Sequence, residues 1–369
     1  MAKKKSENSV KRLSLKTVIL QDMVSKAVKG ASQNKLIPIT SLMAIRLEDN
    51  KLTFITTDQT NTLYIMNDKI DGDDFYCVVH VEQFSKLISK ITSENTVLEL
   101  DGAILTVRAN GNYKIELPLD EDGGLIQYPD PVSKADFDFE SEIINLSTIK
   151  TILNTNKAAL PASVDNPVYS GYYVGDKVIT TDSFKICGLS VKLFNEPVLI
   201  SPELMNLLDV ITAEKIEVQS DADVLMFTTP DCVVYGYKMS GIEEYDVEAI
   251  NTLLDEEFEN TCRVNRNDLL LLLDRISLFV GAYDGHEITL TFTDSGIDVS
   301  SKQSNGIETI SYHDVKSQSN YTCRIHVAEL IQQLKANTAD LVEIQFGNDR
   351  SIKLVDGNVV QVISLFEDE

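Results

Sequence analysis

The chain has 369 residues, 43% of them hydrophobic and 24% charged, which is enough for two or three domains with buried cores. No apolar run approaches the length of a membrane span, and the basic residues 1–15 lack the apolar core of a secretory signal. The net charge of −24 argues against a conventional nucleic-acid binder, unless the 33 Lys and Arg residues gather on one surface.

The residues that usually carry chemistry are scattered. The five cysteines form no CxxC pair, which argues against disulfides and a zinc site and favours buried, reduced thiols in a cytoplasmic protein. The four histidines show no metal-ligand spacing, and the sequence contains no phosphate-binding loop or serine-nucleophile motif. We therefore expect no enzymatic activity, no metal and no other cofactor.

Six segments carry apolar residues at the spacing i, i+3, i+4 and i+7, which predicts a helix with one buried face. In chain order the stripes begin at Leu20, Phe84, Ile149, Leu204, Leu269 and Val327. The third stripe departs from the template only at Asn156. Alternating residues predict strand hairpins over residues 97–107, 216–227 and 342–354, and three further strands end in Thr-Asp at residues 57–58, 181–182 and 293–294.

These elements recur about every 120 residues, which predicts a repeated architecture. We predict an α+β fold of three domains over residues 1–139, 140–257 and 258–369. Each domain would hold two helices and two sets of antiparallel strands. The connectors follow the YPDP segment at residues 128–131 and span the acidic residues 243–259, which we expect to be a solvated linker.

The order of elements and several motifs resemble the bacterial β sliding clamp, the processivity subunit of replicative DNA polymerase III. Residues 36–45 (LIPITSLMAI) resemble the family's first-domain segment, and residues 125–129 (LIQYP) resemble the close of that domain. Residues 178–186 (VITTDSFKI) resemble its TDGHRL signature. Here Ser183, Phe184 and Lys185 replace Gly-His-Arg, and residues 362–365 replace the usual C-terminal Met-Pro-Met-Arg. The chain is thus similar to a divergent member, such as one encoded by a phage or mobile element.

The resemblance implies half of a ring around double-stranded DNA. Helices packed side by side at about 9 Å leave a bore of roughly 7 Å for six helices and roughly 24 Å for twelve. Only the larger bore admits a duplex, so we expect a head-to-tail homodimer. Helix faces opposite the apolar stripes carry the cations expected to face DNA: Lys26, Lys29, Lys86, Lys90, Lys150, Lys157 and Arg275.

Two further sites follow from the resemblance. The dimer seam would join an edge strand at residues 113–117 to the end of the fifth predicted helix, through Ile115, Leu117, Leu278 and Phe279. Short peptides of the polymerase and the clamp loader would bind an apolar pocket between domains two and three. Its residues would be Tyr169, Thr181, Ser183, Phe184, Lys185, Ile186, Val247, Val360, Val362 and Ser364.

Three readings remain open at the level of sequence. The first is a DNA-encircling clamp, which tethers a polymerase without catalysing a reaction. The second is a clamp-fold interaction scaffold that does not encircle DNA, and the third is an enzyme on a repetitive α+β scaffold. A trimeric ring of a different domain count also stays open.

Overall fold

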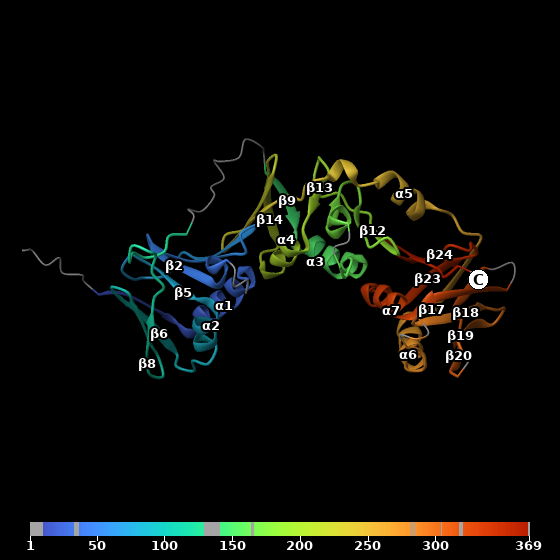
Figure 1. Ribbon diagram of the computed structural model, residues 1–369, viewed down its shortest axis with the longest axis horizontal. Helices are drawn as coiled ribbons and strands as arrows, with labels where there is room; N and C mark the ends of the chain where they lie inside the picture. The colour runs from blue at the N-terminus through green and yellow to red at the C-terminus, as the bar shows by residue number, and fades with distance from the viewer. Residues whose placement is uncertain are drawn as a thin grey trace, which may run out of the picture. The chain divides into compact units, whose positions relative to one another are not determined.

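The computed structural model describes residues 10–32, 37–128, 141–163, 166–281, 283, 285–303, 305–316 and 320–367 (Figure 1). The chain forms two compact units. The first unit comprises residues 1–147 and 203–238, and the second comprises residues 148–202 and 239–369. The predicted second domain contributes strands to both units, and its assignment as a separate domain stays a prediction.

An eight-stranded antiparallel sheet dominates the first unit. Its order is β5-β2-β3-β4-β16-β15-β14-β9. The strands are β2 (Leu42–Glu48), β3 (Lys51–Thr57), β4 (Asn61–Asn67), β5 (Phe75–His80), β9 (Glu142–Asn145), β14 (Lys215–Ser220), β15 (Val224–Thr228) and β16 (Cys232–Tyr237). Strand β4 pairs with β16, so segments more than 160 residues apart form one continuous sheet.

A four-stranded antiparallel sheet and three helices complete the first unit. The sheet has the order β1-β6-β7-β8, with β1 (Lys11–Lys16), β6 (Asn95–Asp101), β7 (Ile104–Arg108) and β8 (Asn112–Glu116). The helices are α1 (Thr17–Ala27), α2 (Val81–Ile88) and α4 (Pro202–Leu207). The Gln21 amide of α1 donates to the carbonyls of Ile88 and Ile91, which fixes α1 against the end of α2.

The second unit repeats this plan with a nine-stranded antiparallel sheet of order β13-β10-β11-β12-β25-β24-β23-β17-β21. Its strands are β10 (Tyr172–Val174), β11 (Val178–Thr181), β12 (Lys185–Leu189), β13 (Val198–Ile200), β17 (Asn260–Asn265), β21 (Asp314–Lys316), β23 (Leu341–Phe346), β24 (Ser351–Asp356) and β25 (Val359–Ser364). The pairing of β12 with β25 joins the 170–200 region to the C-terminal strand.

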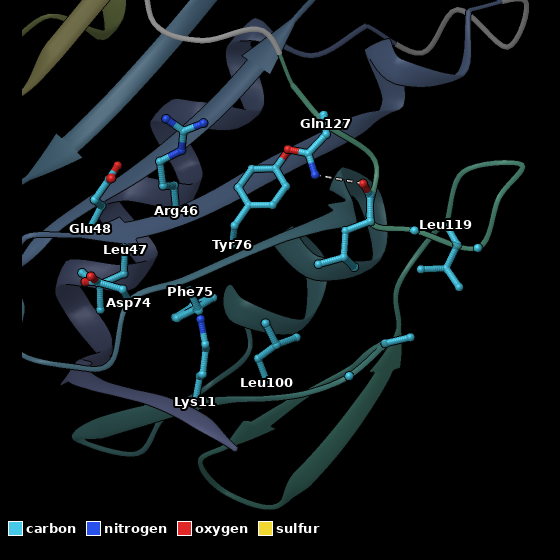
Figure 2. Close-up of a pocket in the computed structure, with 15 residues that line it drawn as sticks. Lys11, Arg46, Leu47, Glu48, Asp74, Phe75, Tyr76, Leu100, Leu119 and Gln127 are labelled. Atoms are coloured by element: carbon cyan, nitrogen blue, oxygen red, sulfur yellow. Dashed lines mark hydrogen bonds between the residues drawn. The ribbon is translucent and has the colours of Figure 1, made fainter. Parts of the chain in front are cut away.

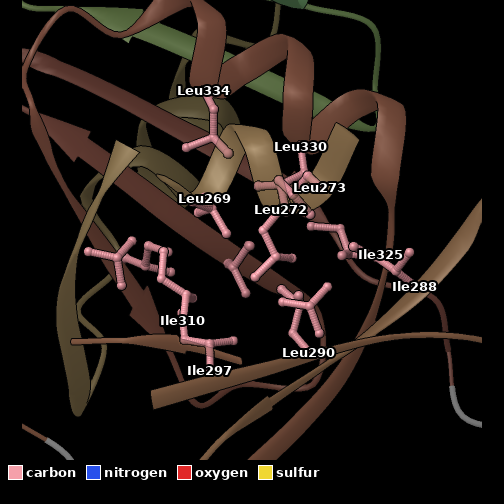
Figure 3. Close-up of a cluster of buried hydrophobic side chains, with 14 of the residues drawn as sticks. Leu269, Leu272, Leu273, Ile288, Leu290, Ile297, Ile310, Ile325, Leu330 and Leu334 are labelled. Carbon is pink, nitrogen blue, oxygen red and sulfur yellow. The ribbon is translucent and has the colours of Figure 1, made fainter. Parts of the chain in front are cut away.

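The rest of the second unit holds a four-stranded sheet and most of the remaining helices. The sheet order is β20-β19-β18-β22, with β18 (Glu287–Phe292), β19 (Gly296–Ser301), β20 (Ile307–Ser311) and β22 (Tyr321–His326). The helices are α3 (Leu146–Thr155), α5 (Val247–Asp255), α6 (Arg266–Ile276) and α7 (Val327–Ala336). The apolar stripes of α6 and α7 meet the inner side chains of this sheet in one core, shown in Figure 3.

All six predicted helices are confirmed, and so are the three hairpins, which are β6–β7, β14–β15 and β23–β24. The departure of the third stripe at Asn156 has a structural reason. The buried side-chain amide of Asn156 donates to the backbone carbonyls of Val178 and Cys187. The backbone carbonyl of Asn156 accepts from Thr180 Oγ1. This position therefore needs a polar side chain that links the helix end to β11 and β12.

The prediction that residues 243–259 form only a solvated linker is wrong, because helix α5 lies within this segment. Asp246 caps its first turn by accepting from the amide of Ala249 at 3.0 Å. Ile250 and Leu254 are buried on one face of the helix. The apolar spacing does not predict this helix, because Asn251 stands at the i+4 position where an apolar residue is expected.

Candidate functional site

A face of the nine-stranded sheet brings three of the ten predicted pocket residues together, namely Ile186, Val360 and Val362. We call it the β12–β25 face and define it by Ile179, Ile186, Gly188, Val360 and Val362. Ile186 lies directly opposite Val362, and Gly188 lies opposite Val360, so all four occupy the same side of the sheet.

This face belongs to an apolar cluster that also contains the predicted residues Tyr169 and Val247. Sequence reasoning missed nine further members: Val168, Tyr173, Ile179, Leu199, Met239, Ile242, Tyr245, Ile250 and Leu254. Tyr245 stacks on Tyr173 with ring centroids 4.9 Å apart and meets Tyr169 edge-on at 5.0 Å. Tyr173 lies on the short strand β10, and Tyr245 lies two residues before the start of α5.

Helix α5 lies across the β12–β25 face in the second unit (Figure 1). A Cβ built on Gly188 would stand 2.7 Å from Leu254 Cδ1, so the helix approaches the sheet as closely as a glycine permits. The buried Lys353 ammonium on β24 donates to the carbonyl of Leu254 at 2.9 Å and to that of Glu256. It thereby supplies donors to the C-terminal end of α5. Burial lowers the pKa of Lys353.

The turn after β11 presents an exposed aromatic side chain. Asp182 Oδ1 accepts from the amides of Phe184 and Lys185, and Thr181 Oγ1 donates to the carbonyl of Lys185. Ser183 has φ of 76°, in the left-handed region, which costs conformational energy at a non-glycine residue. The turn leaves the Phe184 side chain 64% exposed.

The first unit builds the same turn after β3. Asp58 Oδ1 accepts from the amides of Thr60 and Asn61, Thr57 Oγ1 donates to the carbonyl of Asn61, and Gln59 has φ of 86°. The repeated Thr-Asp signal in the sequence therefore corresponds to a repeated turn. Of these two turns, only the one after β11 carries an aromatic residue at its tip.

Three of the predicted pocket residues hold the turn after β11 in place and do not line an open pocket. Thr181 and Lys185 are buried, and the Lys185 ammonium is paired with Asp182. Ser364 is exposed, and its amide donates to the carbonyl of Phe184 at 2.8 Å, which ties the end of β25 to the turn. The Lys185 ammonium is thus neutralised by Asp182 within the turn and is not available to bind a ligand.

The predicted DNA-facing cations divide into two groups. Lys26 pairs with Asp22 at 2.9 Å, Lys86 with Glu82, and Arg275 with Glu308 on β20 at 2.6 Å. The other four are exposed and have no carboxylate partner among the described residues: Lys29, Lys90, Lys150 and Lys157. These four carry the available positive charge.

The predicted seam residues fall in different environments. Ile115 and Leu117 are only 2% and 6% exposed, because they point into the core under the four-stranded sheet of the first unit. The expectation that they project from the edge strand is therefore corrected. Leu278 and Phe279 follow α6 and are 82% and 52% exposed. The edge strand β8 exposes Tyr113 instead.

The first unit also contains an open cavity of about 940 Å³ that corresponds to none of the predicted sites. Figure 2 shows its lining, with Arg46, Tyr76 and Gln127 on one side and Lys11 on another. The Arg46 guanidinium lies 5.7 Å from the centre of the Tyr76 ring. Its lining combines Lys11 and Arg46 with Glu48 and Asp74.

All five cysteines are buried and unpaired, as predicted. Burial raises the pKa of Cys187, Cys232, Cys262 and Cys323 to about 12, so these thiols stay protonated and unreactive. In the described part of the chain, His, Cys, Asp and Glu side chains form no group of three suited to a metal ion. None of the helices described above is long and apolar enough to span a membrane.

No family model and no curated protein sequence matches the chain. Solved structures do match it over nearly its whole length. The DNA polymerase sliding clamp from Bacillus subtilis is 16% identical with a TM-score of 0.85, and the match covers 98% of this chain and 100% of that one. The DNA polymerase beta subunit of Streptococcus pyogenes is 18% identical with a TM-score of 0.85, over 97% and 100% of the two chains.

The DNA polymerase III subunit beta from Borrelia burgdorferi, solved in complex with a natural product, is 14% identical with a TM-score of 0.85, again over 97% and 100%. Sequence identity this low shows a shared fold only. The ligands of this protein therefore have to be inferred from its own residues. The chain has the α+β fold of the bacterial DNA polymerase III beta sliding clamps and is a divergent example of it.

Proposed function

We propose that the chain is a DNA sliding clamp, a non-enzymatic processivity factor of the cytoplasm that encircles duplex DNA and tethers a polymerase. The observation that carries the proposal is the full-length match to solved sliding clamps, at a TM-score of 0.85. The exposed lysines on and next to helices support it, because a chain with a net charge of −24 otherwise repels phosphate.

DNA contact would be loose and independent of sequence. Lys29, Lys90, Lys150 and Lys157 offer ammonium groups on flexible stems, which suit transient phosphate contacts. Lys26, Lys86 and Arg275 already have carboxylate partners and would contribute less. Sliding requires such weak contacts, because base readout would hold the ring at one position.

The ring would close as a head-to-tail homodimer through two edge strands. β8 ends the four-stranded sheet of the first unit, and β20 ends that of the second. Ile307 is exposed on β20, Leu278 and Phe279 are exposed after α6, and Ile104 and Tyr113 are exposed on β7 and β8. An edge strand with exposed apolar neighbours is suited to pairing with another copy.

Partner proteins, namely a polymerase and a clamp loader, would bind through short peptides at the partly exposed rim of the cluster that α5 covers and at the turn that carries Phe184. Phe184 offers an exposed aromatic contact, and Tyr169, Val247 and Val360 are the partly buried apolar members of the cluster. Exposed aromatic anchors beside a packed apolar cluster are typical of peptide contacts.

Mass and shape test the assembly directly. Light scattering should give twice the chain mass of 41.1 kDa, and negative-stain images should show closed rings. A monomer at every concentration used would favour the alternative, a clamp-fold interaction scaffold that does not encircle DNA.

A further inference from the structure

We infer that a network of buried side-chain amides fixes the alignment of helix α7 on the segment that follows α3, inside the second unit. We call it the amide network and define it by Asn156, Gln333, Asn337 and Gln361. The inference goes beyond the proposed function, because it concerns the interior of this unit alone. In the proposed ring, a fixed alignment would hold the edge strand β20, which shares a core with α7, at one angle for pairing with a second copy.

The first observation is that the amide network is completely buried. The exposed fraction is 0% for Asn156, Gln333 and Gln361, and 3% for Asn337. Asn and Gln side chains usually lie at the surface of a protein. None of the four is charged, so an ion pair does not account for their burial.

The second observation is that its hydrogen bonds join segments that are far apart in the sequence. Gln333 Nε2 on α7 donates to the backbone carbonyl of Ala158, in the 3₁₀ turn Asn156–Ala159 after α3, at 3.1 Å. Asn337 Nδ2 donates to Gln361 Oε1 on β25 at 2.8 Å. Gln361 Nε2 donates in return to the backbone carbonyl of Gln333 at 3.2 Å. Helix α7 is thereby tied both to the turn beside it and to the C-terminal strand (Figure 1).

The third observation is that the amide network adds little to stability. Gln333 Oε1 and Asn337 Oδ1 are buried and have no donor within the described residues. Unpaired buried acceptors are costly, whereas replacing hydrogen-bonded partners by apolar groups of the same shape can be nearly neutral. Hydrogen bonds, however, need a particular distance and angle. The amide network therefore selects one alignment more than it supplies free energy.

Helix α7 needs such a selection because its other buried face is apolar. Val327, Leu330 and Leu334 pack in the core beneath the four-stranded sheet of the second unit. Apolar contacts are non-directional, and cores that rely on them lose a unique packing before they lose stability. Directional bonds on the opposite face remove the alternatives.

Pulsed electron paramagnetic resonance between two spin labels tests the inference. The labels are attached at Asn154→Cys on α3 and Ala328→Cys on α7, both at exposed positions. The five native cysteines are buried and stay unlabelled. With the amide network intact, the distribution of distances between the labels should show a single narrow peak.

The network variant is Gln333→Met with Asn337→Leu and Gln361→Met, which removes the amides at similar side-chain size. Its distance distribution should broaden about twofold, because other packings of α7 become accessible. The matched control is Leu330→Ala, which removes contacts from the apolar face of the same helix. This control should lower the melting temperature more than the network variant does, and its peak should stay narrow.

Gln333→Met alone breaks only the bond to the Ala158 carbonyl and should give an intermediate width. A narrow, unshifted peak in both amide variants would overturn the inference, and so would equal broadening in Leu330→Ala. A network variant that fails to fold would show that the amides supply stability and not alignment, which overturns the inference as well.

Discussion

The contact between Leu254 and Gly188 decides whether α5 is part of the fold or a loosely attached linker. Leu254 is 3% exposed, and its Cδ1 and Cδ2 atoms lie 2.7 and 3.1 Å from the place that a Cβ on residue 188 would take. Leu254→Ala and Gly188→Ala therefore change the same small volume, and the two substitutions should be coupled.

The structure sets the size of each effect. Leu254→Ala removes three carbon atoms from a buried site at the surface of the sheet and should destabilise the docking of α5 by about 2–3 kcal/mol. Gly188→Ala alone should cost up to about 1 kcal/mol, because the Leu254 side chain must move while the strand gains from losing a glycine. In the double variant the new methyl group occupies vacated space, so we expect a favourable coupling of about 1–2 kcal/mol.

Hydrogen exchange of the amides of α5 measures this docking locally, which matters because a chain with two compact units need not unfold in one step. Exchange should speed up in Leu254→Ala and slow again in the double variant, while the amides of α6 stay unchanged. Strictly additive effects would refute the contact between α5 and β12.

Three further predictions follow from the described contacts. Replacing Lys29, Lys90, Lys150 and Lys157 by Glu should reduce processive synthesis and its salt tolerance more than the same change at Lys26, Lys86 and Arg275, and equal losses would contradict the division into free and paired cations. Tyr113→Glu with Phe279→Asp places like charges on both edges and should give a folded monomer by light scattering; a dimer of unchanged stability would place the seam elsewhere. The pKa of Lys353 is lowered in the folded protein, so between that pKa and 10.5 the unfolded chain binds more protons and the free energy of unfolding should rise with pH. Lys353→Met should remove this rise in thermal unfolding measured across that pH window, and a rise that persists would exclude Lys353 as its source.

Much of the fold could be predicted because its helices bury one face each. The stripe at Leu269, Leu272, Leu273 and Ile276 is apolar at every buried position, and the structure buries all four side chains. Repetition added a second signal, since the Thr-Asp turns after β3 and β11 form the same hydrogen bonds. Local pattern and long-range packing agree in these elements.

The site could be predicted less well, because its residues depend on packing that local pattern does not report. Helix α5 escaped prediction because its acidic exposed side resembles a linker and Asn251 interrupts its stripe. Ile115 lies on the edge strand β8 and Leu117 follows its end, but only tertiary packing decides which of the two sides of this segment is buried. Lys185 resembles a binding residue in sequence, and only the structure reveals its pairing with Asp182.

Retention on DNA of defined topology tests the central claim most directly. The protein is loaded onto nicked circular DNA by the clamp loader, separated from free protein on a sizing column, and then exposed to an enzyme that linearises the circle. A sliding ring should stay with the circle at moderate salt and be released once the DNA has free ends. Equal retention on circular and linear DNA, or no retention on either, would contradict encirclement.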